Sequence, residues 1–254
     1  VVNMSLSKEL TATLLKEVPA AYNTRIDDLL LSALGLSMHD WNDADSISVL
    51  FEGHGREDLF DDVDLSRTAG WFTALYPVKL KLPESSDPSE ATSRTIKSVK
   101  EQLRKIPSNG IGYGLMRFMN EKYRDRFKGD PIPEVSFNYL GQLDAGAAPV
   151  ENQKQLLSGA KEFSGHPFDP NEEREHILDI LGQVTSGVLN VTFIFSRNLH
   201  RKETIEQLAD NYKRHLTKLI EHCLEPDAGG YTPSDFDDVS LTEEELDSIL
   251  AQVE

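Results

Sequence analysis

The sequence of 254 residues has few of the side chains that cross-link proteins or bind transition metals. Its one cysteine, Cys223, cannot form an internal disulfide, and no set of cysteines and histidines has the spacing of zinc ligands. Such a chain suits a reducing compartment. We therefore expect a cytoplasmic protein that binds no metal and no cofactor directly.

Long apolar runs and basic residues are also scarce. No apolar run approaches the roughly 20 residues of a membrane-spanning helix, and Val1–Met4 lacks the charged and apolar parts of a signal peptide. Lys and Arg number 26 against 43 Asp and Glu, and the formal net charge of −17 repels phosphate backbones and anionic membranes. We expect a soluble protein with neither nucleic acid nor a membrane as partner, which leaves room for a basic protein partner.

The remaining composition is that of a folded body. Hydrophobic residues make up 39% and charged residues 27% of the chain, and its length favours one compact unit. Helical spacing predicts helices over 5–18, 24–41, 90–106, 115–123, 202–223 and 241–253. The first would be capped by Ser5 or Ser7, the second by Thr24, and the last by a capping box from Thr242 to Glu245.

Two-residue alternation predicts strands over 47–51, 74–82, 135–140, 176–181 and 188–196. The stretch 144–163 has no firm period and is typical of a long loop. Because the helical and strand segments alternate along the chain, we expect an α/β fold with a mixed sheet and flanking helices.

Four ionisable side chains follow the predicted strand 47–51: Glu52, His54, Arg56 and Glu57, alternating at first with glycines. Burial and neighbouring charges at such a junction can shift pKa values, as catalysis requires. Spacing alone favours a surface turn with solvated or paired charges. A second glycine cluster, 110–114, lacks the Lys-Ser/Thr ending and the preceding strand of a phosphate-binding loop, so no nucleotide site is expected.

Several segments, in this order, resemble the epimerization domains of nonribosomal peptide synthetases, which are relatives of condensation domains. They are Tyr22-Asn23-Thr24 with Ala33–Leu36, Glu52-Gly53-His54-Gly55-Arg56-Glu57, Arg67–Thr73 with Tyr76-Pro77-Val78, Gly110–Gly114, Phe137-Asn138-Tyr139-Leu140-Gly141-Gln142 and the closing Tyr231–Phe236. The resemblance covers nearly the whole chain.

The resemblance implies a chloramphenicol-acetyltransferase-like fold of two α/β subdomains arranged in a V, with the active site in a tunnel between them. Residues 1–230 resemble the C-terminal subdomain, and 231–254 would be an acidic linker or docking segment. The His-His-x-x-x-Asp motif of the family belongs to the N-terminal subdomain, and the seven histidines here never occur as an adjacent pair. We therefore expect the chain to be inactive without that N-terminal subdomain.

The activity implied is inversion, from L to D, of the α-carbon of an aminoacyl or peptidyl thioester. The substrate would be carried on the phosphopantetheine arm of a peptidyl carrier protein. Glu52 matches the glutamate proposed as acid/base in the family; burial would favour its proton, and Arg56 would oppose it. Asn138 and Tyr139 match tunnel positions from which they could hydrogen-bond the thioester. For Tyr139, packing in the core is an equally weighted interpretation.

Four further residues are substrate-binding candidates by the same resemblance: Trp71, Phe72, His54 and Arg56. Trp71 and Phe72 would line the tunnel, with Gly70 supplying backbone freedom. We expect His54 and Arg56 to shape the loop and to pair with Glu57 or Asp58 rather than to perform chemistry.

Two other functions stay open. One is a condensation-type acyltransferase that forms an amide in the same tunnel, and the other is a non-catalytic scaffold that binds carrier protein. The expected partners are the peptidyl carrier protein, the N-terminal subdomain of the same epimerization domain and a downstream synthetase subunit. The last would meet the acidic C-terminal helix through a weak, salt-sensitive contact.

Overall fold

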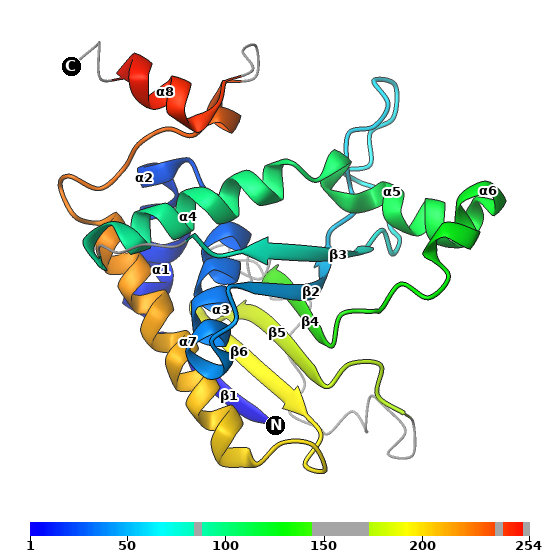
Figure 1. The fold of residues 1–254 in the computed structure, drawn as a ribbon, viewed down its shortest axis with the longest axis horizontal. Coiled ribbons are helices and arrows are strands. Elements are labelled where there is room, and N and C mark those ends of the chain that lie inside the picture. The colour runs from blue at the N-terminus through cyan, green and yellow to red at the C-terminus, as the bar shows by residue number, and fades with distance from the viewer. Residues whose placement is uncertain (84–87, 144–172, 237–240, 251–254) are drawn as a thin grey trace, which may run out of the picture.

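A mixed six-stranded sheet forms the centre of the molecule, in the order β1-β6-β5-β4-β2-β3 (Figure 1). The computed structural model describes residues 1–83, 88–143, 173–236 and 241–250. Strands β2, β4 and β5 run parallel to one another, and the other three pair antiparallel. The strands are β1 (Val2–Ser5), β2 (Ser46–Gly53), β3 (Ala74–Lys81), β4 (Val135–Gln142), β5 (Leu178–Thr185) and β6 (Val188–Phe195). The mixed sheet expected from the sequence is confirmed.

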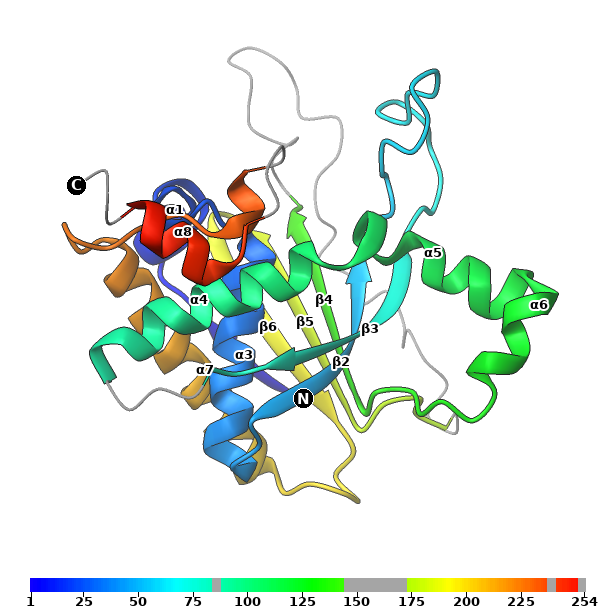
Figure 2. The same ribbon diagram turned by 45° about the horizontal axis from the view of Figure 1, so that its top comes forward.

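The three longest helices cover one face of this sheet (Figures 1 and 2). Alternate strand residues are buried there, and α3 (Ile26–Asn42) packs against α7 (Lys202–Cys223) beside them. The remaining helices are α1 (Lys8–Lys16), α2 (Pro19–Tyr22), α4 (Pro88–Arg104), α5 (Ile111–Gly114), α6 (Glu121–Arg124) and α8 (Glu243–Leu250). No helix in the described ranges is long and apolar enough to cross a membrane.

Segment 107–127 is less regular than the helix predicted over 115–123. A 3₁₀ turn (Pro107–Gly110), α5, a π-helical turn (Leu115–Met119), α6 and a second 3₁₀ turn (Asp125–Phe127) follow one another. Together they extend to one side of the sheet (Figure 2). Asn120 interrupts the predicted helix: its extended backbone, with φ of −103° and ψ of 108°, separates the π-helical turn from α6, and its side chain accepts from the Lys122 amide.

Helix capping agrees with the sequence at two of three positions. The Ser7 hydroxyl accepts from the Leu10 amide at 3.2 Å, and Thr242 and Glu245 form the expected capping box. The prediction for Thr24 is wrong, because α3 begins after Arg25, whose amide donates to the Asp28 carboxylate at 2.6 Å.

The sheet differs from the predicted strands at β1 and at β5. Strand β1 was missed because its four residues pair with β6, far away in the sequence, and carry too short a pattern to be recognised. Strand β5 runs on to Thr185 instead of ending at Leu181, and the hairpin turns on Ser186 and Gly187 alone. Their φ angles of 53° and 75° match the two-residue turn that suits twisted antiparallel strands. The predicted loop 144–163 lies outside the described residues.

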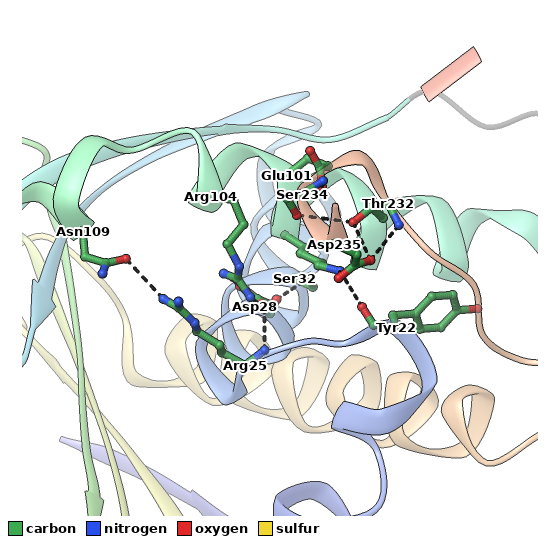
Figure 3. A network of polar contacts seen from close by, with 11 residues as sticks. Tyr22, Arg25, Asp28, Ser32, Glu101, Arg104, Asn109, Thr232, Ser234 and Asp235 are labelled. Atoms are coloured by element: carbon green, nitrogen blue, oxygen red, sulfur yellow. Dashed lines mark hydrogen bonds and ion pairs between the residues drawn. The ribbon is translucent and has the colours of Figure 1, made fainter. Parts of the chain in front are cut away.

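The closing segment 229–236 is bound to the body of the fold rather than extending from it (Figure 3). The Lys100 ammonium, only 1% exposed, donates to the Asp235 carboxylate at 2.7 Å and to the Tyr22 carbonyl at 2.8 Å. The Ser234 amide donates to the Glu101 carboxylate at 3.1 Å. Asp235 therefore neutralises a buried charge on α4, where an unpaired ammonium would be strongly destabilising.

Candidate functional site

Glu52 lies near the carboxyl end of β2, next to Asn138 on the parallel strand β4. The preceding residues, Phe51 and Phe137, are buried on the helix-covered face. Because successive strand side chains point to opposite faces, Glu52 and Asn138 project together from the other face of the sheet. Both are half-buried there.

The environment of Glu52 favours its protonated form. Burial raises the pKa of the carboxyl group, and hydrogen bonds from the side chains of Thr73 and Asn138 partly oppose this shift. The opposing influence expected from Arg56 is not observed, because its guanidinium group is engaged elsewhere in the loop. A half-buried carboxyl group with a raised pKa can hold and release a proton closer to neutral pH than a solvated glutamate.

Arg56 organises the long excursion between β2 and β3, drawn in cyan in Figures 1 and 2. Its guanidinium donates to the Leu65 carbonyl at 2.8 Å and the Gly70 carbonyl at 3.4 Å, and lies 4.3 Å from the Phe72 ring centroid. The prediction that Arg56 pairs with Glu57 or Asp58 is therefore wrong, while its predicted role in shaping the loop is confirmed.

Gly55 shows why the loop requires glycine directly after His54. Its φ of +63° lies in the left-handed region, and a Cβ atom there would lie 1.6 Å from the Phe72 carbonyl oxygen. The loop thus closes on itself through a backbone contact that no side chain can accommodate. At Gly70, packing rather than backbone freedom favours glycine, because a Cβ atom added there would lie 2.9 Å from the Phe72 ring.

His54 pairs with Glu57 as predicted, with 3.5 Å between Nε2 and Oε1. The Arg56 amide donates to His54 Nδ1 at 2.9 Å. Since Nδ1 accepts a hydrogen bond, the proton of the ring lies on Nε2, the nitrogen that faces Glu57. Trp71, in contrast, is 88% exposed, and Phe72 lies beneath Arg56.

Tyr139 follows Asn138 and therefore belongs to the helix-covered face, opposite to Glu52. Its ring packs against the core, and a Cβ atom on Gly182 would lie 3.3 Å from it. Burial raises the pKa of the hydroxyl to about 12, with a further contribution from the charge of Asp27. The hydroxyl is thus protonated at neutral pH and is available as a hydrogen-bond donor on the helix-covered face.

Asp27 is a residue of this region that sequence reasoning did not identify. It lies in the first turn of α3, where burial and then the neighbouring Asp28 raise the pKa of its carboxyl group to about 6. The Asp27 charge in turn raises the pKa of Tyr139, while the charge of His54 lowers that of Asp27. The only signal in the sequence is the Asp27-Asp28 pair. Acidic residues are common in the first turn of a helix, so the pair by itself does not indicate a functional site.

The described residues contain no candidate metal site. In that part of the chain, no group of three or more His, Cys, Asp or Glu side chains is arranged to hold a metal ion.

The family model described as "Condensation domain" matches residues 2–242. The chain belongs to the condensation-domain family. Tyrocidine synthase 2 of Brevibacillus parabrevis is 39% identical over 98% of this chain and 7% of its own length. Gramicidin S synthase 1 of Brevibacillus brevis is 39% identical over 98% of this chain and 23% of its own length. The chain thus spans less than a quarter of either relative.

Among solved condensation-domain relatives, the epimerization domain from the third module of tyrocidine synthetase B superposes with a TM-score of 0.75 at 36% identity. The match covers 88% of this chain and 48% of that one, so the chain spans about half of the solved domain. A four-domain nonribosomal peptide synthetase, holo-AB3403, gives a TM-score of 0.60 at 12% identity over 87% of this chain and 16% of its own, a likeness of fold alone. The α/β fold with a mixed sheet, expected for one half of a chloramphenicol-acetyltransferase-like domain, is confirmed.

Proposed function

We propose that this chain is the C-terminal half of an epimerization domain and inverts the α-carbon of an aminoacyl or peptidyl thioester from L to D. The observation that carries the proposal is the half-buried Glu52 carboxyl group, with a raised pKa and side-chain hydrogen bonds from Thr73 and Asn138. The 36% identity to a solved epimerization domain supports the same assignment.

Inversion requires a base on one face of the α-carbon and an acid on the other. Glu52 supplies one of them, since burial brings its proton affinity closer to neutral pH. The other group comes from outside this chain, from the N-terminal subdomain that carries the paired histidines in the family. Activity therefore needs the complete domain.

Asn138 and Tyr139 support this chemistry in different ways. The Asn138 amide donates to the Glu52 carboxylate and fixes its orientation on the open face of the sheet. Tyr139 keeps its proton, because its pKa is raised to about 12, and its hydroxyl is a donor for the thioester oxygen as enolate charge develops. Asn138 acts beside Glu52 on the open face near the carboxyl end of β2, and Tyr139 acts from the helix-covered face of β4.

The excursion between β2 and β3 forms the wall of the substrate tunnel in this proposal. Trp71 offers an exposed apolar surface to the pantetheine arm, and Arg56 holds Phe72 in place beneath it. His54 keeps the start of the loop in shape through Glu57. The carrier protein brings the substrate, as in synthetases whose domains work with carrier domains. The acidic helix α8 links or docks to a downstream synthetase subunit, because 231–236 is held against the body of the fold.

Amide formation by a condensation-type acyltransferase is the second candidate, and the description of the matching family model favours it. It uses the same tunnel and the same carrier-bound thioester. A scaffold that binds carrier protein without turnover is the non-catalytic alternative for the isolated chain.

The test is to offer aminoacyl and peptidyl carrier protein to the complete domain in D₂O and to analyse the released acyl group. Epimerization gives the D-isomer with deuterium at the α-carbon. An amide product with retained L-configuration and no deuterium would show acyl transfer instead of epimerization. If neither product forms, the non-catalytic scaffold is the remaining hypothesis.

A further inference from the structure

Glu57 is the inner carboxylate of the loop that follows Glu52. Its side chain is only 15% exposed, whereas that of its neighbour His54 is 70% exposed. One carboxylate oxygen, Oε1, faces His54 Nε2 at 3.5 Å. The other, Oε2, accepts from Asn109 Nδ2 at 2.6 Å. Asn109 belongs to the turn after α4, so this hydrogen bond ties the loop to a distant part of the chain.

The backbone that carries Asn109 is unusual. Ser108 and Asn109 both have φ of 46°, in the left-handed region, and Gly110 follows with φ of 77°. Left-handed conformations are unfavourable for residues with a Cβ atom, and two in succession persist only where the surrounding structure enforces them. Gly110 shows the constraint, since a Cβ atom there would lie 2.2 Å from the Tyr76 ring. The turn is thus pressed against β3 with the Asn109 amide facing Glu57.

The other end of the Asn109 amide is anchored to the core (Figure 3). Arg25 Nη1 donates to Asn109 Oδ1 at 3.2 Å, and the Arg25 amide donates to Asp28 at 2.6 Å. Asp28 is fully buried and receives both Arg104 amino groups, at 3.0 and 2.7 Å. Since a guanidinium only donates and a carboxylate only accepts, the orientation of the Asn109 amide is fixed by its two partners.

We propose that Asn109 is a positioning residue that holds the loop 53–57, and with it the end of β2 that carries Glu52, in its working geometry. The neutral amide transmits the rigidity of the Arg104–Asp28–Arg25 cluster to Glu57, which then fixes His54. The inference rests on the proposed function, in which Glu52 exchanges a proton with the substrate. A small displacement of Glu52 lowers the rate without preventing substrate binding.

Asn109→Asp is the sharpest single substitution, because it keeps the shape of the side chain and its acceptor for Arg25 but removes the donor for Glu57. In the complete domain we expect kcat for α-proton exchange to fall about tenfold with KM within about twofold. Amide hydrogen exchange of residues 53–57 should accelerate by a similar factor.

The double variant Asn109→Asp/Glu57→Gln is the matched test. It exchanges donor and acceptor: the amide introduced at position 57 donates to the carboxylate introduced at position 109, and the amide oxygen still accepts from His54. The summed charge of the two positions is unchanged. We expect kcat and amide protection to return to within about threefold of wild type. A double variant as impaired as Asn109→Asp would overturn the proposal, as would an Asn109→Asp domain that behaves like wild type in both measurements.

Asn109→Gly separates positioning from stability. Glycine relieves the left-handed backbone and deletes the amide, so the melting temperature should stay level or rise while kcat falls. Asn198→Gly, at the exposed turn after β6, is the control and should leave kcat unchanged. A parallel loss of stability and activity in Asn109→Gly would make Asn109 a purely structural residue.

The two proposals fail in different ways. If Glu52→Gln exchanges the α-proton at the wild-type rate, the proposed function is wrong, while amide protection still reports whether Asn109 holds the loop. If Glu52→Gln is inactive, but kcat stays at the wild-type value in Asn109→Asp and in the double variant while amide protection of the loop is lost and then restored, only the positioning role is wrong.

Discussion

Phe51 on β2 and Phe137 on β4 stack with their ring centroids 6.2 Å apart and their planes within 9° of parallel. The two rings are register partners on neighbouring parallel strands, buried on the helix-covered face. Their stacking sets the alignment of the next pair, Glu52 and Asn138, on the opposite face. The apolar core thus determines which polar residues meet in the candidate site.

Thr73→Val should raise the pKa of Glu52 further. The Thr73 hydroxyl donates to the carboxylate and lowers its pKa, so an isosteric side chain without a donor removes that stabilisation of the charged form. In the complete domain, the limb of the pH–rate profile that reports Glu52 should move to higher pH. Thr185→Val, at the exposed end of β5, is the control. A shift to lower pH is incompatible with the hydrogen bond described here.

Gly110→Ala should destabilise the protein far more than Gly129→Ala, although both glycines have positive φ, 77° and 85°. A Cβ atom on Gly129 meets nothing within 4 Å, so only the backbone term applies, about 1 kcal/mol. At Gly110 the Cβ atom would lie 2.2 Å from the Tyr76 ring, which adds about 1–3 kcal/mol of overpacking. Urea unfolding of both variants measures the difference, and equal costs would refute the packing argument.

Asp235→Asn should cost about 3–5 kcal/mol at neutral pH, because it leaves the buried Lys100 ammonium without its counter-ion. Asp125→Asn removes an exposed ion pair with Lys128 instead, and should cost less than about 1 kcal/mol. Chemical unfolding of the two variants compares the buried pair with the exposed one. Similar losses of unfolding free energy in the two variants would show that burial does not make the Lys100–Asp235 pair more important for stability than an exposed pair.

The Lys100–Asp235 pair also predicts a pH dependence. Burial raises the pKa of Asp235, but hydrogen bonds from Lys100 and Thr232 and the Lys100 charge outweigh it, so the pKa lies below its usual value. The folded state therefore gains stability above the unfolded pKa and loses it as the pH falls through the folded pKa. The stability gap between wild type and Asp235→Asn should narrow below the usual aspartate range. A gap that widens there would contradict the sign of the shift.

Local pattern predicted much of the fold, because hydrophobic alternation and spacing reflect which face of an element is buried. Leu189, Val191, Phe193 and Phe195 identified β6, and the long amphipathic helix α7 followed it as expected. Strand β1 could not be found in this way, since four residues become a strand only through pairing with β6. The cap at Arg25 likewise depends on a carboxylate that a distant arginine, Arg104, holds in place.

The candidate site was predictable in its residues but not in its contacts. Glu52 and Asn138 were both named from the sequence, yet their pairing depends on the register of two strands that lie far apart along the chain. Arg56 was expected to meet an adjacent carboxylate, but the loop folds so that backbone carbonyls reach it first. Asp27 and Asn109 went unnoticed because their significance lies in neighbours that the sequence does not place nearby.

The central claim is that Glu52 exchanges a proton with the α-carbon of the substrate. The most direct measurement is the rate of α-proton exchange with solvent, for carrier-bound substrate, in the complete domain carrying Glu52→Gln. We expect a loss of at least about a hundredfold, with carrier binding unchanged. Glu134→Gln, at an exposed position just before β4, is the matched control and should retain the wild-type rate. An unchanged exchange rate in Glu52→Gln would contradict the account.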